Sequence, residues 1–217
     1  MSVNMPREKK SARLPAVERR AQLLDVGRRV FARRGFEAAS IEEIAEVARV
    51  SRPIVYAHFG DKSGLFAVVV DREMEHVVQR VTEAMSAEGG ARERLERVLV
   101  AFLRYVEERP DGFAVLSRET PARAGMEGIT GLLGDLAARV AAVMKPFLET
   151  NGFDSRAAPI YANGLIGMAT FTGMWWQQKG RRPSLHVVAR HLSALAWAGL
   201  GHLPHRPELA IGKEPRR

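Results

Sequence analysis

The sequence of 217 residues contains no cysteine. Without thiols the chain has no means of forming a disulfide bond, a thiolate zinc site or a cysteine nucleophile. A chain without disulfides fits a reducing compartment. The first twenty residues are basic and polar and lack the apolar segment of a secretory signal. We therefore expect a cytoplasmic protein.

The sequence also lacks the short motifs that carry common enzyme chemistry. It has no glycine-rich phosphate loop, no nucleophile elbow and no paired acid–base constellation. Glu73 and His76 have the spacing of half a di-iron motif, but such a site needs a second copy and two further glutamates. We expect no enzyme, no metal site and no cofactor, with a small helical enzyme or carrier as the alternative.

Acidic residues are in the minority, with 25 Asp and Glu against 33 Lys and Arg, and the formal net charge is +8. Residues 1–70 hold thirteen basic and eight acidic residues, so the first third of the chain carries most of the excess. A basic N-terminal third is typical of a module that contacts the phosphates of a nucleic acid. Many soluble proteins are basic for other reasons, so charge alone leaves this open.

Strand-like alternation is missing too, and helical periodicity runs through the whole chain. Glycine and proline separate the apolar stripes and set the helix ends. The predicted helices cover residues 15–34, 41–48, 52–59, 62–87, 91–108, 111–117, 128–150, 155–178 and 184–201. The sequence therefore predicts an all-α protein of about nine helices. We divide it into a basic flexible tail (1–14), a three-helix DNA-binding domain (15–64), a larger helical domain for ligand binding and dimerisation (65–205) and a second flexible tail (206–217).

Only three residues separate the second and third predicted helices, which end at Ala48 and begin at Arg52. Such a short connection predicts a helix-turn-helix, in which the second helix enters the major groove of DNA. Its outward face consists of Ser51, Arg52, Pro53, Ile54, Tyr56 and His58. An arginine can read guanine, an isoleucine can contact a thymine methyl, and tyrosine and histidine can bind phosphates. Tyr56 could instead be a core aromatic residue.

A more specific pattern surrounds this motif, in the run RRAQLLDVGRRVFARRGFEAASIEEIAEVARVSRPIVYAHFGDKSGLF. Over these roughly 50 residues the chain resembles the DNA-binding domain of the TetR family of bacterial transcriptional regulators. The resemblance implies base and phosphate contacts from the face just described, and phosphate contacts from Ser40 and Lys62. One residue departs from the family, because Arg49 stands in the turn where glycine is usual. If that position needs a left-handed backbone, arginine costs about 1 kcal/mol there.

Two apolar seams with near-heptad spacing run along the last two predicted helices. They predict a four-helix bundle with a second copy of the chain, an arrangement that resembles the TetR-family dimer interface. Burial within one chain is the alternative. The predicted interface residues are Leu165, Met168, Thr172, Trp175, Val188, Leu192, Leu195 and Gly199.

Residues 157–176 carry no formal charge and are long enough to cross a membrane. Pro159, Asn163 and three glycines favour a helix that is buried on both faces of a helical domain instead. We expect such a domain to enclose an apolar cavity, which the kink predicted at Pro146 would shape. The candidate lining residues are Phe66, Phe102, Tyr105, Phe113, Met126, Met144, Phe147, Phe171, Met174 and Trp176.

Together these patterns predict a homodimeric, ligand-responsive repressor that binds a palindromic operator in double-stranded DNA. A small, largely apolar effector would release it. An activator with the same architecture remains open.

Overall fold

The computed structural model describes residues 15–117 and 129–204. All regular secondary structure in these two stretches is helical, which confirms the predicted all-α class. The helices are α1 (Ala16–Ala38), α2 (Ile41–Ala48), α3 (Arg52–Phe59), α4 (Lys62–Ser86), α5 (Ala91–Glu108), α6 (Pro110–Ser117), α7 (Ile129–Thr150), α8 (Ala158–Gln178) and α9 (Leu185–Gly201), with a short 3-10 helix at Ser155–Ala157. Both predicted tails, Gly128 and Met126 lie outside the described residues.

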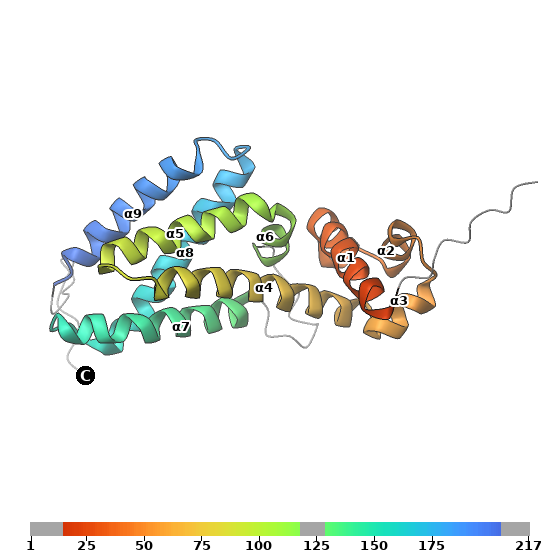
Figure 1. The fold of residues 1–217 in the computed structure, drawn as a ribbon, viewed down its shortest axis with the longest axis horizontal. Helices are drawn as coiled ribbons and strands as arrows, with labels where there is room; N and C mark the ends of the chain where they lie inside the picture. Colours follow the sequence, from red (N-terminus) through yellow and green to blue (C-terminus); the bar gives the residue numbers. More distant parts are fainter. Residues whose placement is uncertain (1–14, 118–128, 205–217) are drawn as a thin grey trace, which may run out of the picture.

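The molecule has two parts, which we call the head (α1–α3) and the body (α5–α9), and the long helix α4 extends from one into the other (Figure 1). The head has its own core, in which Phe31 of α1, Ile44 of α2 and Val55 of α3 are at most 1% exposed. The core continues into the first turns of α4 and includes Val115 of α6. The head is therefore packed against the body through two helices.

Two glycines fix how the head is built. Gly35 interrupts α1 with φ 75° and ψ 172°, at the position where the sequence predicted the helix to end. Gly64 lies in the first turn of α4, so close to α3 that a Cβ there would overlap the carbonyl oxygen of Phe59. The Asp61 carboxylate accepts a hydrogen bond from the Gly64 amide at 2.7 Å and caps α4. This close contact fixes the direction in which α4 leaves α3.

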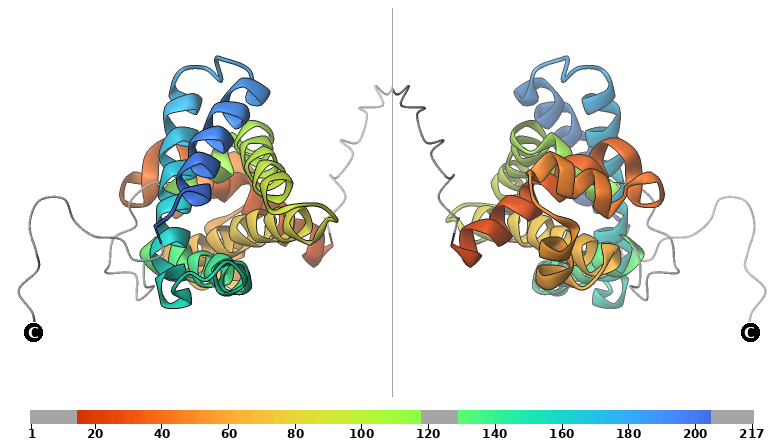
Figure 2. Two further views of the ribbon diagram at one scale, coloured as in Figure 1. Left: turned by 90° about the vertical axis from the view of Figure 1, so that its left-hand side faces the viewer. Right: turned by 90° about the vertical axis from the view of Figure 1, so that its right-hand side faces the viewer.

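In the body, α5 packs between α4 and α9, and α7 packs along α8. Figures 1 and 2 show α9 at one edge of the body and α7 at the opposite edge, and α8 crosses between them. α7 runs through Pro146. Among the helices of the described segments, none is long and apolar enough to cross a membrane. The uncharged residues 157–176 lie almost entirely in α8, a helix of the body.

The turn between α2 and α3 has the left-handed backbone that the sequence suggested. Arg49 has φ 55° and ψ 47°, and its side chain is exposed. Its amide donates to the carbonyl oxygen of Glu46 at 3.0 Å, and the next amide, of Val50, donates to that of Ala45 at 2.9 Å. These two bonds close the end of α2 and hold the turn in place despite the side chain at position 49.

We expect the substitution Arg49→Gly to raise the free energy of unfolding by up to about 1 kcal/mol. Glycine removes the steric cost of the left-handed backbone, although its greater freedom in the unfolded chain offsets part of the gain. Urea denaturation at one fixed chain concentration measures the difference. Arg49→Ala is the control, because it removes the same charge and keeps the Cβ. Equal stability of the two variants would show that the backbone strain contributes nothing.

Candidate DNA-binding surface and ligand cavity

The predicted outward face of α3 lies on the surface of the head. Ser51, Arg52 and Pro53 are exposed, and Ile54 and Tyr56 are 37% and 47% exposed. These exposures exclude the alternative that Tyr56 is a core residue. His58 is half-buried. The face thus presents apolar, aromatic and basic side chains together, as a surface that reads DNA requires.

The guanidinium group of Arg52 is held by a neighbour on α2. It donates to the Glu42 carboxylate at 2.9 Å, and both side chains are exposed. The hydrogen bond from Arg52 lowers the pKa of Glu42. An arginine that reads a base must first leave this partner.

Lys62 is placed differently from the prediction that it holds a phosphate. Its ammonium group donates to three backbone carbonyl oxygens, those of Phe36 at 2.9 Å, Glu37 at 3.2 Å and Ala39 at 3.1 Å. The break at Gly35 leaves these carbonyls without helical partners, and the lysine satisfies them. Bonded in this way, Lys62 stabilises the end of α1, and its role as a phosphate ligand stays a prediction.

Ser40 is the N-cap of α2, as the sequence indicated. Its hydroxyl oxygen accepts from the Glu43 amide at 3.1 Å. The hydroxyl proton is not used by that bond, so Ser40 can still donate to a phosphate.

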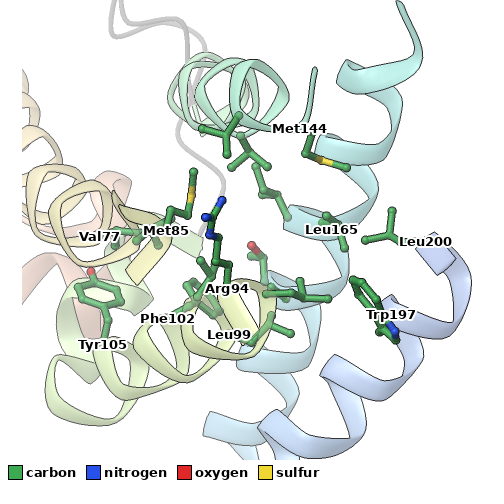
Figure 3. Close-up of a pocket in the computed structure, with 18 of the residues that line it drawn as sticks. Val77, Met85, Arg94, Leu99, Phe102, Tyr105, Met144, Leu165, Trp197 and Leu200 are labelled. Carbon is green, nitrogen blue, oxygen red and sulfur yellow. The ribbon is translucent and has the colours of Figure 1, made fainter. Parts of the chain in front are cut away.

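The body encloses an apolar cavity of about 250 Å³ (Figure 3). Its walls come from α4, α5, α6, α7, α8 and α9. The lining residues are Met74, Val77, Val81, Met85, Ala91, Arg94, Leu95, Val98, Leu99, Phe102, Tyr105, Phe113, Leu116, Ser117, Val140, Val143, Met144, Phe147, Leu165, Ile166, Ala169, Thr170, Trp197 and Leu200.

Half of the ten residues predicted to line a cavity do so, namely Phe102, Tyr105, Phe113, Met144 and Phe147. The prediction was wrong for four others. Phe66 lies in the core of the head, edge to face with Phe31. Met174 and the fully buried Trp176 belong to the body core but not to the cavity lining, and Phe171 is 73% exposed. Met126 lies outside the described residues.

Arg94 is a lining residue that the sequence analysis missed. Among the described residues that line the cavity it alone carries a charge, and its side chain extends from α5 toward Met85 (Figure 3). It is exposed, and across the described part of the chain no ion pair involves it. The helical period of α5 assigns Arg94 to the solvent face of that helix. Only the folded structure shows that this face borders a cavity.

Part of the predicted dimer interface is packed within the single chain. Leu165 lines the cavity, and Val188 and Leu192 are buried in the body cores, so these three side chains already pack within the single chain. Met168 and Thr172 are half-buried. The remaining predicted residues, Trp175, Leu195 and Gly199, are exposed.

Four large apolar side chains of α8 and α9 are exposed, and two of them, Trp175 and Leu195, belong to the predicted interface. Ile160, Phe171, Trp175 and Leu195 are 72%, 73%, 47% and 65% exposed, and we call this set the α8–α9 apolar face. Gly164 and Gly167 lie on α8 between the first two, and a Cβ added at either would meet nothing within 4 Å. On α8, Gly164, Gly167 and Phe171 each precede a predicted interface residue by one position, which corresponds to a rotation of about 100° around the helix.

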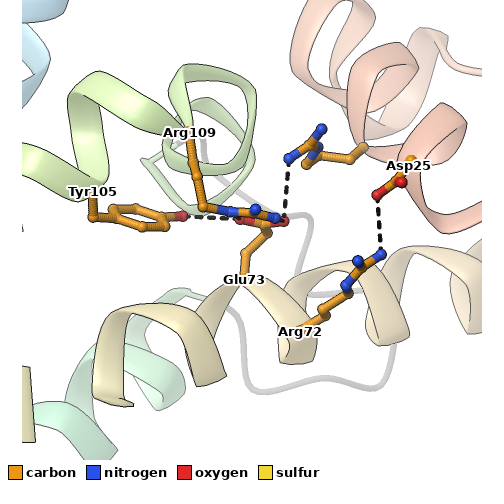
Figure 4. A network of polar contacts seen from close by, with 6 residues as sticks. Asp25, Arg72, Glu73, Tyr105 and Arg109 are labelled. Carbon is orange, nitrogen blue, oxygen red and sulfur yellow. Dashed lines mark hydrogen bonds and ion pairs between the residues drawn. The ribbon is translucent and has the colours of Figure 1, made fainter. Parts of the chain in front are cut away.

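A buried carboxylate joins the head to the body (Figure 4). Glu73 of α4 is 2% exposed and accepts two hydrogen bonds from the Arg109 guanidinium, at 2.9 and 2.5 Å. The Tyr105 hydroxyl donates to it at 3.3 Å, and Arg28 of α1 lies 3.8 Å away. We call these four residues the Glu73 junction.

Charge balance keeps the Glu73 junction ionised. Burial alone would raise the pKa of Glu73, but hydrogen bonds from Arg109 and the positive charges of Arg109 and Arg28 together hold it below its usual value. Burial raises the pKa of Tyr105, so its hydroxyl keeps its proton and remains a donor. The neighbouring His76 has its pKa lowered by burial and by Arg109. Glu73 is therefore a buried negative charge between half-buried cations.

Comparison with known proteins gives matches along almost the whole chain. Residues 23–69 match the family described as bacterial regulatory proteins, tetR family, and residues 80–210 match the tetracyclin repressor-like C-terminal domain. The transcriptional activator FasR of Mycolicibacterium smegmatis is 28% identical over 201 residues, which cover 88% of this chain and 87% of FasR.

Solved structures agree with this assignment. A TetR-like regulator from Rhodococcus sp. RHA1 is 29% identical, with a TM-score of 0.73 over 88% of this chain and all of that one. FadR of Bacillus subtilis, solved in complex with stearoyl-CoA, has a TM-score of 0.71 over 82% of this chain and 98% of that one. Its sequence is 17% identical, so this second likeness shows the fold alone.

We expect Glu42→Gln to strengthen binding to duplex DNA by about three- to fivefold at low salt, because it frees Arg52 and removes a charge that repels phosphates. Fluorescence anisotropy with a duplex selected from random sequence by the wild-type protein measures the change. Glu46→Gln is the matched control, since it removes an exposed carboxylate from the same helix without touching Arg52. Equal gains from both variants would mean that the ion pair does not restrain Arg52.

Proposed function

The chain belongs to the TetR family of bacterial regulatory proteins, and on that premise we propose that it is a homodimeric switch whose affinity for a palindromic operator depends on an amphiphilic effector. That the chain is a DNA-binding transcriptional regulator, and not an enzyme, follows from the family and from relatives such as FasR. The operator contacts, the dimer and the effector are the parts that we propose. A regulator of this kind works beside the chromosome, so we place it in the cytoplasm.

The proposed DNA contacts rest on the exposed face of α3, from Ser51 to His58. It stands directly after the three-residue turn that sets α3 across α2. We infer that Arg52 reads a base, Ile54 contacts a thymine methyl, and Tyr56 binds a phosphate. These residues would enter successive major grooves from two copies of the chain, with half-sites about 10 base pairs or a multiple apart.

We infer that the α8–α9 apolar face is where two copies meet. Its large side chains lie in water in a single chain, which costs free energy that a partner would recover. The open space beside Gly164 and Gly167 lets a second helix approach closely. A twofold arrangement of this face would place two heads on the two halves of a palindrome.

We expect Arg52→Ala to weaken binding to the selected operator at least about tenfold, because a bidentate base contact is lost. The control Arg92→Ala, on an exposed arginine of α5, should stay within about twofold of the wild type, because Arg92 lies far from the head along the chain. Tyr56→Phe should weaken specific and non-specific duplexes alike, because a phosphate contact carries no sequence information. Anisotropy at several salt concentrations measures all three. Unchanged operator binding by Arg52→Ala would contradict the proposed reading face.

The dimer is tested with the same duplex. Phe171→Glu should sediment as a single chain and bind the full palindrome no better than a half-site, whereas the neutral control Gln178→Ser should behave as the wild type. A Phe171→Glu variant that still sediments as a dimer would show that another surface joins the copies.

For the effector we propose a long acyl chain that carries an anionic group. The cavity is lined mostly by apolar side chains, which suits a hydrocarbon chain, and Arg94 at its wall offers a guanidinium group that forms no ion pair with the described residues. The fold likeness to FadR, which was solved with stearoyl-CoA, supports the acyl class.

We expect stearoyl-CoA and stearate, below their micelle concentrations, to change the fluorescence of Trp197 in the cavity wall. Arg94→Met should weaken both by at least about tenfold, because a charge-assisted contact is lost, and should alter octadecanol binding by less than about twofold. Arg92→Met is the matched control on the same helix. If Arg94→Met binds all three ligands like the wild type, the anionic group lies elsewhere. If none of them binds the wild type, the acyl class is wrong.

The sense of regulation follows from where the operator lies. A dimer that covers a promoter blocks polymerase, which is the repression that we predicted from the sequence. FasR is an activator, and this favours activation as the second candidate. Transcription in vitro from a template that carries the selected operator distinguishes the two.

A further inference from the structure

Tyr105 belongs at once to the cavity and to the Glu73 junction. Its ring is part of the cavity wall, and its hydroxyl donates to Glu73 at 3.3 Å. The side chain is buried, and its hydroxyl end is packed against Glu73 and Gly112, so that end cannot move without displacing a neighbour. A molecule that enters the cavity and presses on this ring therefore also acts on the hydrogen bond to Glu73.

The carboxylate of Glu73 has little room to respond. Gly112 of α6 lies so close that a Cβ there would overlap a Glu73 oxygen, and it would come within 2.9 Å of the Tyr105 hydroxyl oxygen. On the α5 side the carboxylate is held by both nitrogens of the Arg109 fork. The contact to Arg28, at 3.8 Å, is the loosest of the set. A change at Tyr105 is thus passed to the side of the junction that faces α1.

Arg28 carries the contact into the head. It lies on α1 between Leu23 and Phe31, which are buried in the head core together with Val55 of α3. The Nε atom of Arg28 is buried and has no hydrogen-bond partner among the described residues, so Glu73 is the anionic group that holds this side chain. Because α1 and α3 share one core, a shift of α1 relative to α4 moves the reading face.

We propose that Glu73 is a positioning residue that transmits the occupancy of the cavity to the DNA-binding head, through Tyr105 on one side and Arg28 on the other. The proposal rests on the proposed function, since it needs an effector in the cavity and an operator under the head. Glu73 stays ionised throughout. What changes is how its charge is shared between Arg109 of the body and Arg28 of the head.

An apolar path also runs between the two parts, because Leu116 of α6 lines the cavity and packs against both cores. The two paths are separated by Tyr105→Phe, which removes one hydroxyl group and leaves every apolar contact of the ring in place. Tyr161→Phe is the matched control, because Tyr161 lies outside both the cavity lining and the Glu73 junction.

The first measurement is the factor by which saturating stearoyl-CoA changes the dissociation constant of the selected operator. We expect this factor to fall below about threefold in Tyr105→Phe, while the wild type and Tyr161→Phe keep a factor of about five or more. Each variant is saturated with stearoyl-CoA according to its own binding curve, so that a change in effector affinity does not enter the factor. A purely structural role of the hydroxyl would leave the factor unchanged, and that result would overturn the proposal.

The second measurement needs no effector. Tyr105→Phe, Arg28→Met and the double variant form a cycle in operator affinity, and Glu73 is the residue that both side chains touch. We expect the double variant to depart from the product of the single effects by at least about threefold. The departure should vanish when Glu73→Gln is added to all four proteins. Arg104→Met, an exposed arginine of α5, replaces Arg28→Met in a control cycle that should be multiplicative.

The two measurements separate the possible failures. If stearoyl-CoA leaves operator binding by the wild type unchanged, the proposed effector is wrong, and the cycle still decides the role of Glu73. If Tyr105→Phe and Arg28→Met act independently, or if their coupling persists without the Glu73 carboxylate, the head is coupled to the cavity by another path. Thermal unfolding followed by circular dichroism shows that each variant compared is folded.

Discussion

The arrangement of this protein depends on one buried charge. The carboxylate of Glu73 is 2% exposed, and an ion so far from water stays in place only while its cationic partners stay beside it. Arg109 and Arg28 come from different parts of the molecule, so satisfying one carboxylate fixes α4 against α5 and α1 together. Removal of one partner of a buried pair typically costs about 3–5 kcal/mol. The orientation of the head on the body is therefore set by charge as well as by apolar packing.

The basic residues of the head divide into those that hold the structure and those that are free to act. Lys62 satisfies the carbonyl oxygens beyond Gly35, and Arg28 faces Glu73, so both are committed to the fold. Arg49 and Arg52 are exposed, and Arg52 is held only by an exposed partner. An exposed ion pair is worth little in water and is exchanged easily for a nucleic-acid contact. Net charge alone does not separate these two groups of cations, whereas the geometry does.

The same distinction shows what could be predicted from the sequence. Helix ends were predicted to within about one residue for most elements, because glycine, proline and short polar caps act locally. The resemblance to the TetR family raised the question of a left-handed turn at Arg49, and the backbone there is left-handed. The roles of Lys62 and Arg94 were not predicted, since they depend on carbonyls and walls that come together only in the folded chain. On α8 and α9 the apolar residues surround the helix, so periodicity offers two seams one residue apart. Only the packing against α5 shows that Val188 and Leu192 face inward while Leu195 faces out.

The helix α8 links the cavity to the face on which we place the second copy. Leu165 contributes to the cavity wall, and Phe171 and Trp175 belong to the open face of the same helix. A rigid helix cannot move at one of these positions without moving at the other, so in the dimer that we propose an occupant of the cavity would act on the spacing of two heads as well as on the tilt of each. The effector need only bind one of these arrangements better than the other, because its difference in affinity is all that shifts the equilibrium. Two outputs from one cavity require a ligand that touches both walls. In that case contact with both Tyr105 and Leu165, rather than the total apolar area, would separate an effector from a ligand that merely fits.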